Sequence, residues 1–227
     1  MPAIHVAGRA SARAVQTEGE TCPSEARCPS RRGLRKKGLR EAVGVVAQAH
    51  PDKRIALWFQ DEARVGQKGR TGHRWWVRGE RPAGLCDRRF KSAYIFAAVR
   101  PATGEDFCLV LPRVSTSAMN RFLADFAQTV PGDTHAIMVL DGAGWHGARA
   151  LRIPDNVSLV PLPAYSPELN PVERVWLYLR ERYLSHRLHT DYNAVVDACC
   201  RAWNALTAET GRIRSLCAYP YLEQVTS

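Results

Sequence analysis

The sequence predicts an α/β domain with a mixed β-sheet, and two observations lead to this prediction. Short apolar runs are gathered between residues 54 and 113, and two continuous apolar runs further on alternate with helical patterns. Neighbouring runs joined by turns favour antiparallel strands, whereas apolar strands separated by helices favour parallel ones. With 227 residues, 45% of them hydrophobic, the chain can bury one core of ordinary domain size.

The first fifty residues have the weakest pattern. Residues 1–30 show little periodicity and no apolar face, so we expect no regular fold there. Residues 39–49 have helical spacing, which stops at the pair His50-Pro51. We therefore divide the chain into an irregular basic segment (1–50), a folded domain (51–210) and a C-terminal tail (211–227).

Four apolar runs predict the strands at the front of the sheet, at 54–62, 73–79, 92–101 and 106–113. The turn-forming run RPATGE (100–105) joins the last two and predicts a hairpin. From these four runs we expect three antiparallel strands at the front of the domain.

Helices and buried strands then alternate. The run STS at 115–117 can cap a helix whose apolar residues lie at helical spacing between 119 and 130. The run HAIMVLDGAGWHG (135–147) predicts a buried strand followed by a glycine-containing loop, and NVSLVPLPAYSP (156–167) predicts one more short strand. A last helix, from about residue 190 to residue 206, is expected to cover the sheet.

The net charge of +10 is informative, because a large basic surplus usually serves a polyanion. Nine basic residues and only two acids lie between residues 64 and 91, around Trp75 and Trp76. Basic residues around exposed aromatic rings suit contacts with DNA phosphates and bases. The alternative is a twisted hairpin with a solvated basic face and buried Trp side chains. The residues of this block expected to bind DNA are Arg64, Lys68, Arg70, Arg74 and Arg78.

Several other classes of protein are excluded by composition. Seven Cys without a CxxC pair indicate neither a disulfide framework nor a zinc ribbon. No apolar run approaches the roughly 20 residues that span a bilayer. The N-terminus also lacks the apolar core of a signal peptide. We expect a soluble, intracellular protein without a membrane partner.

Two apolar strands each place an Asp at or near their carboxyl end. The run IALWFQD ends in Asp61, and AIMVLD ends in Asp141. Open α/β sheets gather their sites at this edge, so the two acids are candidates for one shared site. Each has an alternative explanation, since an Asp after a strand often forms a turn or caps a helix.

The stretch NPVERVWLYL (170–179) supplies a third acid. Asn170 before Pro171 suits a helix N-cap, and Glu173 then falls at the third helical position, which is also the capping-box position. Glu173 precedes Trp176 of the buried face by one turn, so its carboxylate points toward the sheet. Glu173 can therefore serve both as a helix-start residue and as a metal ligand.

Carboxylates from two strand ends and a helix start suit hard divalent cations, which prefer oxygen ligands. Paired Mg²⁺ ions roughly 3.5 to 4 Å apart can activate a water or hydroxyl and stabilise the leaving oxygen in phosphodiester cleavage. A basic surface next to an acidic metal site indicates chemistry on nucleic acid. Glu168, in the turn between two prolines, is interpreted as a turn residue only.

At these residues the sequence resembles a known family. FQDEARVG (59–66), LDGAGWH (140–146) and YSPELNPVERVW (165–176) resemble the three catalytic blocks of DDE transposases of the mariner superfamily, in the bacterial insertion-sequence branch IS-six-thirty. The similarity extends roughly over residues 51–183. The third block, a Ser-Pro-acid-Leu-Asn-Pro-x-Glu run, is its most specific part.

The resemblance implies a ribonuclease-H-like fold, with a mixed five-stranded sheet and helices on both faces, and metal-dependent cleavage and joining of DNA strands. It makes Asp61, Asp141 and Glu173 the catalytic and metal-binding triad, holding two Mg²⁺ ions that Mn²⁺ can replace. His146 matches the family's His after the strand and could contact a phosphate or orient the site; a structural His is the alternative. The implied partner is double-stranded DNA, bound at element ends and target by a homodimer.

Three features depart from the family. Only 31 residues separate Asp141 from Glu173, fewer than usual. Asp141-Gly142-Ala143 stands where the family often has Asp-Asn-Ala. Residues 1–50 are too short to supply the helix-turn-helix modules that normally precede the catalytic domain. We therefore expect a truncated copy or one half of a split gene.

Three functions remain open from the sequence. The first is a transposase catalytic domain that cleaves and joins DNA strands. The second is a degenerate remnant that only binds DNA through the basic block at 64–91. The third is a structure-specific nuclease that hydrolyses DNA without strand joining.

Overall fold

The computed structural model describes residues 4–6, 36–67, 77–80, 89–142, 149–162, 167–185 and 187–222. Its strands are β1 (Ile4–Val6), β2 (Arg54–Gly66), β3 (Ser92–Arg100), β4 (Glu105–Leu111), β5 (Thr134–Leu140) and β6 (Val157–Pro161). Its helices are α1 (Lys36–Ala49), α2 (Thr116–Ala127), α3 (Val172–Leu179), α4 (Tyr192–Ala208) and α5 (Arg212–Leu216). A 3₁₀ turn at Pro167–Leu169 precedes α3, and a π-helical turn at Arg180–Leu184 continues it. No helix in the described ranges has the length and apolar character to cross a membrane.

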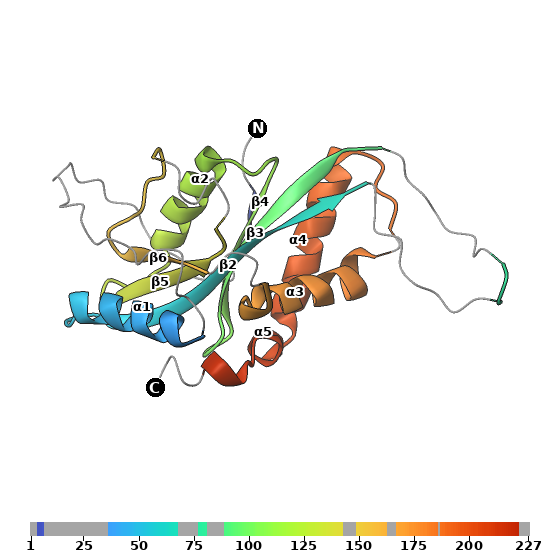
Figure 1. Cartoon of the computed structure of the whole chain (residues 1–227). Coiled ribbons are helices and arrows are strands. Elements are labelled where there is room, and N and C mark those ends of the chain that lie inside the picture. Colours follow the sequence, from blue (N-terminus) through green and yellow to red (C-terminus); the bar gives the residue numbers. More distant parts are fainter. Residues whose placement is uncertain are drawn as a thin grey trace.

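The strands form one mixed sheet in the order β1-β4-β3-β2-β5-β6 (Figure 1). β2, β3 and β4 are antiparallel, with the predicted hairpin between β3 and β4, whereas β5 and β6 run parallel to β2. The predicted five-stranded mixed sheet is confirmed in β2 to β6. A short sixth strand, β1, extends it at the edge by antiparallel pairing with β4.

Two expectations about the chain are wrong in part. Residues 1–30 were expected to lack regular structure, yet Ile4–Val6 forms β1, because the edge strand β4 offers backbone groups that even a short apolar segment can pair. Of the strand predicted at 73–79, residues 73–76 lie outside the described ranges. Residues 77–80 form a turn, in which Gly79 has φ of 93°.

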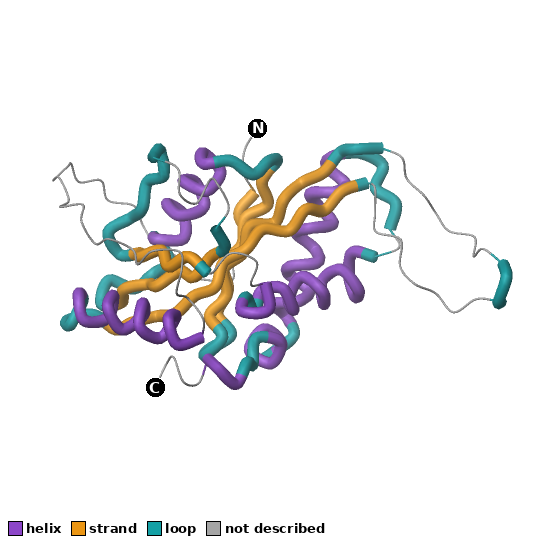
Figure 2. Tube along the Cα trace, in the orientation of Figure 1, coloured by secondary structure: helices purple, strands orange, loops and turns teal. Residues whose placement is uncertain are grey.

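Helices cover both faces of the sheet, as predicted (Figures 1 and 2). α2, capped by Ser115 as expected, buries its apolar residues on one face. α1, α3, α4 and α5 pack on the other. Because side chains alternate along a strand, β2 contributes to both cores: Ala56 and Trp58 face α2, whereas Leu57 and Phe59 face α3 and α4.

The C-terminal residues belong to the same core as α3. Ile213, Cys217, Tyr221 and Leu222 are all buried there. The Tyr221 hydroxyl donates a hydrogen bond to the backbone carbonyl of Leu169, in the 3₁₀ turn before α3. Residues of the segment predicted as a tail therefore support the start of α3.

Candidate active site

β2 carries Asp61 to the face of the sheet that α3 and α4 cover. Asp61 follows Leu57 and Phe59 onto this face by strand alternation. β5 runs parallel to β2 with Val139 opposite Phe59, the last pair of this ladder, and Asp141 directly follows β5. Val139 faces the same core as Phe59. Asp61 therefore lies within β2, which continues to Gly66, and Asp141 follows the neighbouring strand β5.

Two hydrogen bonds fix the carboxyl group of Asp61. Its Oδ1 accepts from the backbone N–H of Glu62 at 2.9 Å, and its Oδ2 accepts from the indole Nε1 of Trp176 at 2.9 Å. Burial raises the pKa of Asp61 from its ordinary value of 3.8 to about 7. The indole bond opposes this rise, whereas the negative charge of Glu173 adds to it, so the two acids lie within electrostatic reach of each other.

Asn170 fixes the start of α3 against β2. Its buried side chain accepts a hydrogen bond from the Val172 backbone N–H at 3.2 Å and donates one to the Gln60 carbonyl at 3.1 Å. Asn170 thus bonds a backbone N–H at the start of the helix, as an N-cap side chain does, although the helix begins at Val172 and the N-cap position itself is Pro171, not Asn170 as predicted. One amide therefore caps α3 and ties it to the residue before Asp61.

Glu173 projects from the first turn of α3 beside Asp61. Glu173, Trp176 and Asp61 line one pocket of about 330 Å³, whose walls continue along α3 and β2. The Glu173 carboxylate is exposed, and among the described residues it has no ion-pair or hydrogen-bond partner. Glu168, exposed in the 3₁₀ turn, is not among the described lining residues. Glu173 is therefore the acid of this stretch that is free to bind a ligand beside Asp61.

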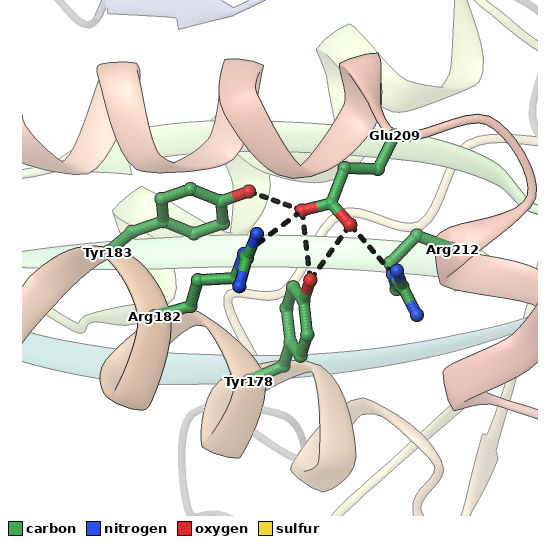
Figure 3. A network of polar contacts seen from close by, with 5 residues as sticks. All are labelled: Tyr178, Arg182, Tyr183, Glu209 and Arg212. Carbon is green, nitrogen blue, oxygen red and sulfur yellow. Dashed lines mark hydrogen bonds and ion pairs between the residues drawn. The ribbon is translucent and has the colours of Figure 1, made fainter.

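A cluster of polar residues anchors the far end of α3 (Figure 3). The Tyr178 hydroxyl donates to both carboxylate oxygens of Glu209, at 2.9 and 2.8 Å, and the Tyr183 hydroxyl donates to one of them. Arg212 pairs with the other oxygen at 2.7 Å, and Arg182 lies 3.6 Å from the first. Because Glu209 is the C-cap of α4, this cluster joins α3 and its π-helical turn to α4 and α5.

Arg180 is a site residue that the sequence motifs did not indicate. It lines the same pocket, and it follows Glu173 by seven residues and Trp176 by four, which places all three on one face of the helix. Its Nε donates to the Trp176 carbonyl at 3.2 Å. Within the part of the chain that the structure describes, it forms no ion pair with either acid. Helical spacing from Glu173 was the signal that could have revealed it.

The structure defines the position of Asp141 relative to the pocket less fully than those of Asp61 and Glu173. It is exposed directly after β5, and the loop at 143–148, including His146, lies outside the described ranges. Among the described residues, no three Asp, Glu, His or Cys side chains are gathered as a set of metal ligands. The structure thus brings Asp61 and Glu173 to one pocket, whereas Asp141 is located only as the residue that directly follows β5.

The residues predicted to bind DNA are described only in part. Arg64 is exposed on β2 and lines the pocket, and Arg78 is exposed in the turn at 77–80. Arg89 has a structural role instead, because its guanidinium donates to the carbonyls of His189 and Thr190 before α4. The remaining predicted residues, which lie outside the described ranges, are Lys68, Arg70, Arg74 and His146.

Comparison with known proteins places this geometry in a family. The model of the family described as "DDE superfamily endonuclease" matches residues 56–196, which include all three acids. The chain belongs to this DDE superfamily. The relationship to DDE transposases expected from the three sequence blocks is confirmed, whereas the insertion-sequence branch stays a prediction.

One protein resembles this DDE-family chain in sequence, and two solved structures resemble it in fold. An uncharacterized protein of Sinorhizobium fredii, y4pE/y4sA, is 47% identical over 124 residues, which are 55% of this chain and 92% of that protein. The Mos1 strand transfer complex matches with a TM-score of 0.56 at 17% identity, and the Mos1 transposase paired-end complex with the left transposon end matches with 0.58 at 20%. The matches cover 93% of this chain but only 65% and 64% of the Mos1 chains. The fold is that of a transposase catalytic domain.

The raised pKa of Asp61 leads to a prediction about stability. Between pH 3.8 and about pH 7 the folded chain binds the Asp61 proton more tightly than the unfolded chain does, so the contribution of Asp61 to stability falls as pH rises through this window. Asp61→Asn does not titrate. We expect its free energy of unfolding, relative to the parent chain, to rise steadily across this window, as measured by urea unfolding in EDTA. A difference that stays constant with pH would contradict the assigned burial.

Proposed function

We propose that this chain is a transposase catalytic domain that cleaves DNA strands and joins the freed ends to target DNA in a metal-dependent reaction. The observation that carries the proposal is the pocket that Asp61 and Glu173 both line, and Asp141 directly follows β5, the parallel neighbour of β2. Membership in the DDE family supports the same chemistry. The chain spans about two thirds of the Mos1 chains it matches, so activity of this chain alone is part of the proposal.

The three acids fit a divalent cation by their chemistry. All supply carboxylate oxygens, which Mg²⁺ and Mn²⁺ prefer, and burial raises the pKa of Asp61 to about 7 with no basic side chain beside it among the described residues. Mos1 complexes with Mn and with Mg share the fold. Asp61, Asp141 and Glu173 would hold the ions, with side-chain movement that brings Asp141 and Glu173 in toward Asp61. When bound, such ions activate the attacking oxygen and stabilise the leaving one.

The residues of the pocket have separate roles in this proposal. Asp61 loses its proton as a cation binds, which makes binding weaker at acidic pH. Glu173 approaches from the opposite wall, on a helix that is fixed at both ends. Arg180 presents guanidinium N–H groups to the same pocket, where a DNA phosphate next to the acids would receive them. Double-stranded DNA is therefore the proposed substrate. We further propose that a homodimer of this chain binds it, and that the chain belongs to the transposases of the IS-six-thirty insertion-sequence branch.

Substitution of the acids tests the catalytic assignment. We expect Asp61→Asn, Asp141→Asn and Glu173→Gln each to lower Mg²⁺- or Mn²⁺-dependent nicking of supercoiled DNA by more than about 100-fold, because even residues that only support a metal ligand are worth about 10–100-fold. Glu168→Gln is the matched control, an acid five residues before Glu173 that is exposed in the 3₁₀ turn, and it should retain parent activity.

The same assay separates the alternatives. Unchanged nicking in any of the three variants would rule out that residue as a ligand. Salt-dependent DNA binding without any nicking in the parent chain would favour a module that only binds DNA. Nicking without strand joining would favour a nuclease.

Arg180 leads to a prediction that does not depend on catalysis. We expect Arg180→Gln to reduce the slope of log binding constant against log salt concentration by about one for a labelled DNA duplex in EDTA, because one phosphate contact is lost. Arg174→Gln is the matched control. It removes the same charge from the same helix, but the Arg174 guanidinium lies 4.7 Å over the Tyr219 ring and does not line the described pocket. An equal slope for Arg180→Gln and the parent would contradict the phosphate contact.

A further inference from the structure

We propose that Trp176 is a positioning residue for Asp61: its indole N–H holds one carboxylate oxygen in place, so that the remaining lone pairs face the pocket and bind a divalent cation more tightly. The inference rests on the metal-dependent function proposed above. It concerns a residue that touches neither the cation nor DNA in this account.

The hydrogen bonds of Asp61 leave its carboxylate little freedom to rotate. Oδ1 is held by the Glu62 backbone N–H and Oδ2 by Trp176 Nε1, both at 2.9 Å. An indole N–H is a donor only, so it can neither take up the Asp61 proton nor compete as a metal ligand. Each carboxylate oxygen accepts more than one bond, so both keep a lone pair for a cation. Trp176 thus orients the Asp61 carboxylate and leaves lone pairs on both of its oxygens for a cation.

Trp176 is itself held rigidly. Its side chain is only 2% exposed and packs against Trp203, with ring centroids 6.1 Å apart and planes at 51°. Its carbonyl accepts the Arg180 Nε bond, and the helix that carries it is tied down at Asn170 and at Glu209. A donor mounted on so fixed a ring defines one position for the carboxylate oxygen.

The spacing of α3 couples the two acids of the pocket. Glu173 and Trp176 lie three residues apart on one face, so a single helix carries one candidate ligand and the group that orients the other. The separation between Asp61 and Glu173 is therefore set within one rigid element and its hydrogen bond to β2. Groups that orient metal ligands in this way typically raise metal affinity or activity by about 10–100-fold.

The chain contains a second Trp–Asp pair that serves as an internal control. Trp203 Nε1, on α4, donates to Asp106 Oδ1, on β4, at 2.8 Å. Both tryptophans are buried in the same core, and in each pair the acid comes from a strand. Asp106 is not among the described residues that line the pocket, so its Trp partner has only a structural role.

The test compares Trp176→Phe and Trp203→Phe in the full chain. Each removes one indole N–H donor and keeps an aromatic ring in the core. Mn²⁺ alone is titrated into each protein by isothermal calorimetry, without DNA. In parallel, the indole N–H signals of the parent are followed by NMR as Mg²⁺ is added. If Trp176→Phe does not fold, benzothienylalanine at position 176, which replaces only the N–H by sulfur, takes its place.

We expect Mn²⁺ affinity to fall by about 10–100-fold in Trp176→Phe and by much less in Trp203→Phe, which packs against Trp176 but removes no hydrogen bond from Asp61. Mg²⁺ should shift the Trp176 indole signal by more than that of Trp203. Equal Mn²⁺ affinity in Trp176→Phe and the parent, or an equal loss in both variants, would overturn the positioning role while metal binding by the parent stands. A parent chain that binds no Mn²⁺ would overturn the metal-dependent function and the positioning role together.

Discussion

The hydrogen-bonded burial of one carboxyl group, that of Asp61, constrains the arrangement of the rest of the site. A carboxylate out of water is costly unless it is paired or hydrogen-bonded. Asp61 receives an indole and a backbone N–H but, within the described part of the chain, no basic side chain. Its pKa rises to about 7 as a result. Such a group lowers stability as pH rises from 3.8 toward 7, but a bound cation would supply the positive charge that favours its ionised form.

α3 holds the pocket residues in fixed positions because the helix is anchored at both ends. Asn170 and Tyr221 hold its start, against β2 and the C-terminal segment respectively, and the cluster around Glu209 holds its end. The helix then presents Glu173 and Arg180 to the pocket from one face. Negative and positive groups thus lie side by side without neutralising each other, as a site for a metal and a phosphate requires.

Much of this fold could be predicted because local patterns and tertiary structure agree. The continuous apolar runs in the first half of β2 and in β5 have no polar face, so burial in the middle of a sheet was the natural outcome. Asp141 follows β5 as expected, whereas Asp61 lies inside β2, which continues to Gly66 beyond its predicted end at residue 62. The role of Asn170 at the start of the helix was recognisable from its neighbours alone.

Contacts between residues far apart in the sequence could not be predicted in this way. Examples are the hydrogen bonds of Asn170 to Gln60, of Tyr221 to Leu169 and of Trp176 to Asp61. The short strand Ile4–Val6 was missed because its pairing depends on the free edge of β4 rather than on its own pattern.

The convergence of the three acids on a cation is tested most directly by anomalous diffraction from crystals of the full chain grown with Mn²⁺. We predict a Mn²⁺ peak in the pocket between β2 and α3, at about 2.0–2.6 Å from carboxylate oxygens, the range of metal–oxygen distances for hard divalent cations. Asp61 should contribute an oxygen and keep its bond from Trp176, and Glu173 and Asp141 should have turned toward the ion. A Mn²⁺ peak outside this pocket, or a Glu173 carboxylate that faces away from an ion held by Asp61, would contradict the shared metal site.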